Sequence, residues 1–174
     1  MTDIGTEQTV QTLMVALNSN DISVRQQARH ALITIGPPAV DQLTTALHDP
    51  REQIRWQAAL LLGNIGDGRA AVDLINAFQD DMLKVRWRAA ESLADLGCQG
   101  LAPLLRALIK HPEKPWLRNG AHHALRLLVV KTDLGELIKP VLTALEGIEP
   151  TMSVPLASAL ALQQLNTTEN LHQA

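Results

Sequence analysis

The chain has 174 residues, a net charge of −3, 46% hydrophobic residues and only 2% aromatic residues. This length is typical of a single domain with a sizeable core, and the scarcity of aromatic side chains favours thin layers of small aliphatic residues. The acidic balance does not favour nucleic acid as a partner. A single cysteine excludes an intramolecular disulfide and fits a reducing compartment.

No targeting or membrane signal is evident in the sequence. The first residues lack the basic and apolar regions of a secretory signal. No run reaches the roughly 18 consecutive apolar residues that a membrane-spanning helix needs. We therefore expect a cytoplasmic protein with no membrane partner.

An apolar stripe with helical spacing recurs five times along the chain. Its first copy is Val10, Leu13, Ala16 and Leu17, which share one face of a helix because they lie three or four residues apart. The later copies begin at Val40, Ala71, Leu101 and Ile138. We expect each copy to be the first helix of a helix pair, followed by a short polar turn.

The second helix of each pair follows a longer motif, which is clearest in residues 54–66. An aliphatic residue and an arginine open it, small residues follow, and a glycine closes it. The motif starts at positions 24, 54, 85 and 117, so its period is 30 to 32 residues, which is the signature of a repeat array. Gly36, Gly66 and Gly97 should end the first three second helices, because glycine tolerates a positive φ.

The fifth pair departs from this pattern. The step from Leu117 to the equivalent Val154 is 37 residues, and Pro155 takes the place of the arginine. We expect Ile138 to lie in the fifth first helix and Val154 to open the fifth second helix. Residues from Asn166 onward are polar and should fray.

The sequence therefore predicts an all-α protein, a right-handed α-solenoid of about five helix pairs (an α–α superhelix). Neighbouring pairs would bury one another's stripes, as in other repeat arrays. We expect one domain over 1–174, with repeats at about 7–36, 37–66, 67–97, 98–130 and 133–165, and a frayed tail over 166–174.

The unit formed by a helix, an Asp-Pro-like turn and Val-Arg-x-x-Ala-x-x-Ala-Leu-x-x-Ile-Gly resembles the HEAT repeat. Its short period resembles the phycobilisome-lyase-like (E–Z) subtype, over about residues 7–165. The resemblance implies that the repeated arginines bind aspartates of neighbouring turns, such as Asp21, Asp49 and Asp80. The arginines of this structural ladder are Arg25, Arg55, Arg86 and Arg118. The alternative role for them is to bind an anion.

The resemblance also implies that the second helices line a concave groove. Residues that follow the arginines would face it, including Trp56 and Trp87 in equivalent positions of adjacent repeats. Trp and Arg are enriched at binding hot spots, although both tryptophans could instead fill gaps between repeats. The predicted partner-binding residues are Trp56, Trp87, Arg29, Leu60, Glu91, Asn119, His122 and Arg126.

Catalytic and cofactor motifs are missing from the sequence. Deoxyhypusine hydroxylase is an enzymatic HEAT protein whose His-Glu pairs bind iron, and no His-Glu pair occurs here. His122 and His123 are adjacent on a helix and about 100° apart, which suits one metal ion poorly. Cys98 lies in a predicted turn with no neighbouring histidine. We therefore expect no catalytic activity, no metal and no cofactor.

The favoured function is that of an adaptor or scaffold that binds a protein partner in the groove. An alternative, which rests on the resemblance alone, is a bilin lyase or isomerase subunit or a phycobilisome-degradation factor, with a tetrapyrrole stacked on Trp56 and Trp87. Nucleic-acid binding is a minor alternative. The last helix is apolar, with Leu156, Leu160 and Leu165, which favours a second contact or self-association there.

Overall fold

The computed structural model describes residues 4–172, and within them the side chains of residues 5–167. This part of the chain forms ten α-helices and three short 3-10 segments and contains no strand. The α-helices are α1 (Ile4–Ala16), α2 (Ile22–Ile35), α3 (Val40–Ala46), α4 (Glu52–Ile65), α5 (Ala71–Asn76), α6 (Leu83–Asp95), α7 (Cys98–Lys110), α8 (Pro115–Lys131), α9 (Gly135–Glu146) and α10 (Pro150–His172). The 3-10 segments are η1 (Pro37–Ala39), η2 (Gly68–Ala70) and η3 (Ala77–Gln79).

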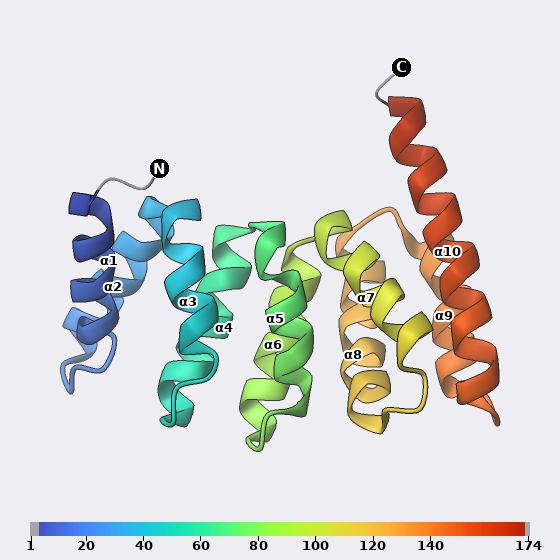
Figure 1. Cartoon of the computed structure of the whole chain (residues 1–174), viewed down its shortest axis with the longest axis horizontal. Helices are drawn as coiled ribbons and strands as arrows, with labels where there is room; N and C mark the ends of the chain where they lie inside the picture. The colour runs from blue at the N-terminus through green and yellow to red at the C-terminus, as the bar shows by residue number, and fades with distance from the viewer. Residues whose placement is uncertain (1–3, 173–174) are drawn as a thin grey trace.

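The first eight helices alternate between two layers, which Figure 1 shows one in front of the other. The first layer contains α1, α3, α5 and α7, and the second contains α2, α4, α6 and α8. In the second layer α4 packs on α6, and α6 packs on α8. Each helix is thus covered by its own partner and by the neighbouring pairs, which is the expected α-solenoid.

Local sequence signals explain where the helices begin and end. The Asp21 carboxylate caps α2 by accepting a hydrogen bond of 2.7 Å from the Ser23 amide. Gly36, Gly66 and Gly97 have φ values of 69°, 74° and 58°. The predicted positive φ is confirmed at all three glycines, although only Gly66 has the left-handed helical conformation.

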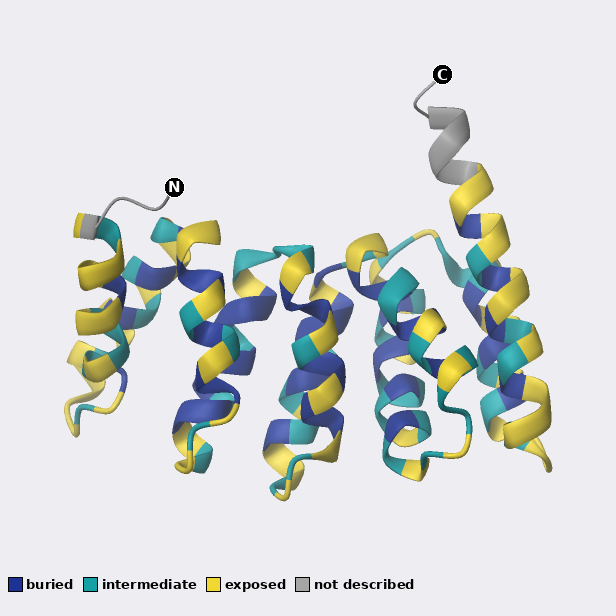
Figure 2. Ribbon diagram, viewed as in Figure 1, coloured by how far each residue is buried: buried dark blue, intermediate teal, exposed yellow. Residues whose placement is uncertain are grey.

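The core lies between the two layers, as the dark bands in Figure 2 show. It consists mainly of alanine and leucine side chains, and its largest fully buried side chain is Phe78. Small residues set the spacing of adjacent helices. A Cβ atom added to Gly63 of α4 would lie 2.7 Å from the Cβ of Ser92 on α6, so glycine is required for this approach.

The fifth pair is reversed, contrary to our expectation. Helix α9, the predicted fifth first helix, packs on α8 and so continues the second layer. Helix α10, the predicted fifth second helix, packs on α7 and α9 and so lies in the first layer (Figure 1). Only residues 132–134 connect α8 to α9, so these two consecutive helices lie side by side in the same layer, and Pro155 lies inside α10.

Helix α10 also extends further than expected. Its backbone is helical as far as His172, beyond Asn166, where we expected the chain to fray. No proline or glycine follows Pro155, so nothing in the sequence stops the helix. Residues 173–174 of the expected tail lie outside the described residues.

The repeated arginines share one contact. Each donates from a terminal guanidinium nitrogen to the carbonyl oxygen six residues earlier, in the turn that precedes its own helix. The distances are 2.6 Å from Arg25 to Ser19, 2.9 Å from Arg55 to Asp49, 2.7 Å from Arg86 to Asp80 and 2.6 Å from Arg118 to Pro112. The arginine thereby ties the turn to the second helix of its own pair.

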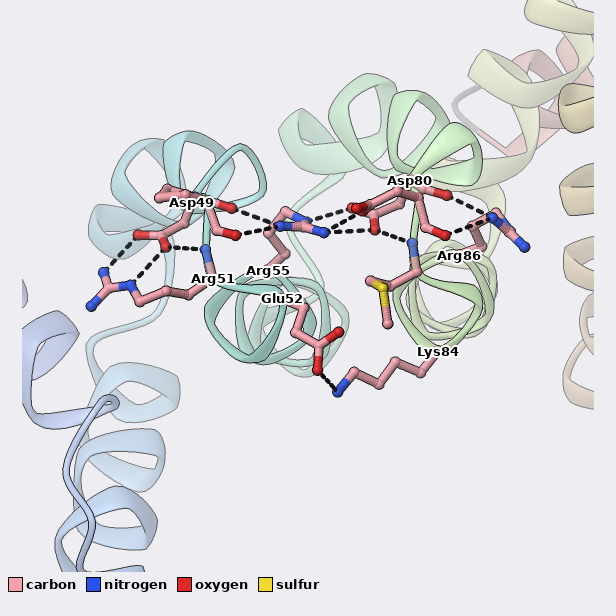
Figure 3. A network of polar contacts seen from close by, with 10 residues as sticks. Asp49, Arg51, Glu52, Arg55, Asp80, Lys84 and Arg86 are labelled. Carbon is pink, nitrogen blue, oxygen red and sulfur yellow. Dashed lines mark hydrogen bonds and ion pairs between the residues drawn. The ribbon is translucent and has the colours of Figure 1, made fainter.

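The carboxylate ladder that we expected forms at one junction only. Arg55 binds both oxygens of Asp80 in the next turn, at 2.7 and 3.0 Å, and one oxygen of Asp81 at 2.5 Å (Figure 3). Asp21 instead caps its own helix, and Asp49 pairs with Arg51 at 2.7 Å. These two carboxylates are therefore satisfied within their own turns and do not reach a neighbouring arginine.

The charges of this network shift the pKa values of its aspartates. Hydrogen bonds from the Arg51 side chain lower the pKa of Asp49 to about 2. Burial alone would raise the pKa of Asp80, but hydrogen bonds from Arg55 and the Met82 amide outweigh it and lower the pKa. The Arg55–Asp80 pair is shielded from solvent, since its side chains are 11% and 7% exposed.

We predict that Asp80→Asn destabilises the protein by about 3 kcal/mol at pH 7, because it leaves the buried Arg55 with only the exposed Asp81 carboxylate as a charged partner. The pKa of Asp80 is lower in the folded than in the unfolded state. Its contribution to stability is therefore complete above about pH 4 and is lost as pH falls through the folded pKa.

Urea unfolding of the wild type and the variant at pH 7 and at pH 3 measures both effects. Asp81→Asn is the matched control, because this carboxylate is 80% exposed and should contribute less than about 1 kcal/mol. A cost for Asp80→Asn that does not change with pH would show that charge is not its cause.

Candidate partner-binding site

The two equivalent tryptophans have different surroundings. Trp56 on α4 is partly buried, and the Arg88 guanidinium of α6 lies 5.0 Å from its ring centroid. Arg88 also pairs with Glu91 at 2.8 Å, one turn further along α6. Trp87 on α6 is 55% exposed, and its ring centroid lies 5.0 Å from that of His123 on α8. Trp56 is thus covered within the fold, whereas Trp87 keeps a free face.

A cleft of about 740 Å³ lies between α6 and α8, beside Trp87. Its floor includes Phe78 from η3, and its walls come from the first turns of the two helices. It contains two of the predicted binding residues besides Trp87, namely Asn119 and His122. The lining residues are Phe78, Gln79, Leu83, Arg86, Trp87, Ala90, Trp116, Asn119, Gly120, His122 and His123.

A second hollow of about 470 Å³ lies between α4 and α6. Trp56, Lys84, Arg88 and Glu91 line it together with Leu83 and Trp87, which also line the cleft. Trp87 therefore stands between the two hollows and borders both. An exposed aromatic side chain between two concavities can contact a ligand that occupies either of them.

Sequence reasoning missed most residues of the cleft, among them Phe78, Trp116 and Gly120. Phe78 belongs to a first helix, and we expected the groove to consist of second helices only. We interpreted Trp116 as a helix staple, yet it lines the cleft with the Lys114 ammonium 5.4 Å from its ring centroid. Gly120 admits Phe78, because a Cβ there would lie 2.2 Å from the Phe78 ring. Gly120 occupies the position that Gln57 and Arg88 have in the other repeats, and this difference was the feature of the sequence that could have predicted the cleft.

The remaining predicted residues lie outside this centre. Arg29, Leu60 and Arg126 line neither the cleft nor the second hollow. His122 lies at the edge of the cleft and is hydrogen-bonded to Glu146 of α9 at 2.8 Å. The structure thus brings together Trp56, Trp87 and Glu91 around one hollow, and Trp87, Asn119 and His122 around the other.

The described part of the chain offers no group of three histidine, cysteine or acidic residues that could hold a metal ion. His122 and His123 face different partners, Glu146 and Trp87 respectively. Cys98 is exposed at the start of α7. None of the described helices has the length and apolar character that crossing a membrane requires.

Known structures include similar chains. A chain of the solved complex of CpcE and CpcF of phycocyanin lyase from Nostoc sp. PCC7120 superimposes with a TM-score of 0.58 and 26% identity, covering 89% of this chain and 98% of that one. An engineered protein superimposes with a TM-score of 0.43 and 20% identity, over 94% of this chain and 82% of that one.

Family comparison gives the clearer result. No curated protein sequence matches the chain significantly. A family model of HEAT repeats matches residues 40–126, which are 87 of the 174 residues and include α4, α6 and most of α8. With the two-layered array of helix pairs and the likeness to a phycocyanin lyase chain, this match shows that the protein belongs to the HEAT-repeat family, with repeats of the phycobilisome-lyase-like type.

Proposed function

We propose that this protein is a non-catalytic adaptor that binds a segment of a partner protein across α4, α6 and α8, with Trp87 as the anchor. The observation that carries the proposal is the half-exposed Trp87 between two hollows. Membership of the HEAT-repeat family supports a role as a protein-interaction scaffold.

The energetics of Trp87 favour binding over packing. Its side chain is large and apolar, so covering its exposed face would be favourable by about 25 cal/mol for each Å² removed from water. Trp56 shows that the fold can cover this position, since Arg88 lies over its ring. At the next junction, the equivalent of Arg88 is Gly120, which covers nothing and leaves the cleft open.

The two hollows suit a ligand with side chains on both sides of Trp87. Their volumes are about 740 and 470 Å³, and residues of α6 line both of them. An amphipathic helix or an extended segment could place an apolar anchor in each hollow. Leu83 and Ala90 supply the apolar walls, and Lys84, Arg88 and Glu91 supply a charged rim, an arrangement typical of binding interfaces.

A second candidate function is that of a lyase-type subunit that binds a tetrapyrrole. The likeness to a chain of the CpcE–CpcF complex of phycocyanin lyase favours it, because the two chains align over nearly their full lengths. Because that similar chain is part of a complex of two named proteins, the same likeness favours a protein partner here. We rank the lyase function second, because the hollows around Trp87 hold no arrangement of side chains with an evident catalytic role.

A further contact surface is proposed on α10. Ile148, Met152, Leu156 and Leu160 are all exposed, at intervals of four residues, and form a stripe beside a hollow of about 630 Å³. Residues 150–168 contain no Asp, Glu, Lys or Arg, so two such helices can pair without repulsion between like charges. We propose that a second copy of this chain covers the stripe, with the two α10 helices related by a twofold axis.

We predict that Trp87→Ala abolishes retention of the partner protein while changing stability by no more than about 1 kcal/mol, because half of the side chain is already exposed. The measurement is capture from lysate of the source cell with tagged wild-type and variant protein, after urea unfolding of both. Val72→Ala is the matched control, since it removes an exposed apolar side chain from α5 in the first layer.

Retention of the same partner by the Trp87→Ala protein would contradict the proposed site. If the wild type instead retains no protein but changes the visible absorbance of an added free bilin, the lyase-type function is favoured. A variant that unfolds well below the wild type would show that Trp87 packs within the fold.

We also predict that the wild type sediments as a dimer at tens of micromolar and that the double variant Met152→Glu/Leu156→Glu sediments as a monomer. The introduced carboxylates would face one another across the twofold axis and would be costly to bury. Sedimentation equilibrium measures this, with circular dichroism to show that helix content is kept. A wild type that is monomeric at these concentrations would refute self-association through α10.

A further inference from the structure

At the junction between α4 and α6, the repeat arginine forms hydrogen bonds with all three of its guanidinium nitrogens. One terminal nitrogen of Arg55 binds carbonyl oxygens of its own turn, Asp49 at 2.9 Å and Pro50 at 3.2 Å. Its Nε atom and its other terminal nitrogen bind the Asp80 carboxylate of the next turn. This fork-to-fork pairing is the geometry in which a guanidinium best binds a carboxylate.

Arg86, the equivalent residue at the junction between α6 and α8, makes only half of these contacts. One terminal nitrogen binds the carbonyl oxygens of Asp80 at 2.7 Å and Asp81 at 3.3 Å. No carboxylate among the described residues pairs with its Nε atom or its other terminal nitrogen. In Figure 3 the guanidinium of Arg86 ends the network on the side away from Asp80.

The sequence of the next turn explains why this carboxylate is missing. Asp80 and Asp81 lie six and five residues before Arg86, and the residues that precede Arg118 by the same intervals are Pro112 and Glu113. Proline has no carboxylate. The Glu113 carboxylate is directed to His111, with 3.7 Å between Oε1 and Nδ1.

Arg86 differs from the other incompletely paired arginines in its surroundings. Arg25 and Arg118 also lack a carboxylate partner among the described residues, but neither lines the cleft or the second hollow. Arg86 lines the cleft beside Trp87 and Trp116. The cleft contains another unpaired polar atom, Nε2 of His123, which is buried without a hydrogen-bond partner. The Lys114 ammonium over Trp116 adds positive charge at the rim.

We infer that the cleft between α6 and α8 binds a side-chain carboxylate, an aspartate or glutamate of the partner segment, on the unpaired edge of Arg86. The partner's carboxylate takes the place that Asp80 occupies on Arg55, and an apolar neighbour in the same segment covers Trp87. This inference rests on the proposed function and specifies its ligand: a segment in which an acidic residue lies beside an apolar one. A cleft wall shields the ion pair from water, which strengthens it.

The chain offers a sharp test, because the missing carboxylate can be restored within the protein. Pro112→Asp places an acid at the position of Asp80 and should occupy Arg86 internally. Pro112→Asn is the matched control without charge. We expect Pro112→Asp to melt at a higher temperature than Pro112→Asn at pH 7, and this difference to shrink as the pH falls below about 4, because protonation of the new acid removes its pairing with Arg86. A difference in melting temperature that is the same at pH 7 and at pH 3 would show that the new acid does not pair with Arg86.

The probe is a library of random 12-residue peptides displayed on phage as fusions without a free C-terminus, selected on the wild type in low salt. Enriched peptides should combine Asp or Glu with an aliphatic or aromatic residue. They should bind Pro112→Asp at least tenfold more weakly than the wild type, and Pro112→Asn equally well. Replacing the acid in the peptide with its amide should reduce affinity for the wild type by a similar factor.

Three outcomes separate this inference from the proposed function. Some peptides could bind Trp87→Ala more weakly than the wild type but bind Pro112→Asp as well as the wild type. This result would support the binding site at Trp87 and refute the binding of a carboxylate by Arg86. Enriched peptides without acidic residues would overturn it as well. If no peptide that depends on Trp87 is enriched, the site itself fails, and the inference fails with it.

Discussion

The hydrogen bond from each repeat arginine to the carbonyl of its preceding turn is the interaction on which the structure depends. It occurs in the first four helix pairs, at the same interval of six residues. A turn between two helices leaves carbonyl groups that helices cannot satisfy. The arginine satisfies them and sets how the second helix lies against the first. These hydrogen bonds lie within single helix pairs, so they hold each second-layer helix to its own turn without any contact between repeats.

The repeats differ in the group that binds Nε and the second terminal nitrogen of the arginine. Between α4 and α6 it binds Asp80, which closes that junction with a buried ion pair. Between α6 and α8 no carboxylate of the described residues pairs with Arg86, and an open cleft lies beside it. Function in this array can therefore arise from a position where the repeat is incomplete. Gly120, which admits Phe78 and leaves Trp87 uncovered, is a second example at the same junction.

The sequence alone was sufficient to predict the repeat period, the α-solenoid and the role of Gly36, Gly66 and Gly97, because these follow from local patterns. It did not predict the reversal of α9 and α10, since both helices carry apolar stripes that fit either layer. It treated Trp56 and Trp87 as equivalent, although the residue that contacts each ring, Arg88 or His123, comes from the neighbouring helix. Such contacts depend on how helices pack, and the repeat pattern does not encode them.

The reversed fifth pair has a consequence for how the protein can be joined to other molecules. Because α10 lies in the first layer, its end is on the opposite side of the array from the second-layer surface of α4, α6 and α8 (Figure 1). A fluorophore, tag or surface linkage attached after α10 would leave that surface unobstructed. The reversal thus gives the array a defined point of attachment.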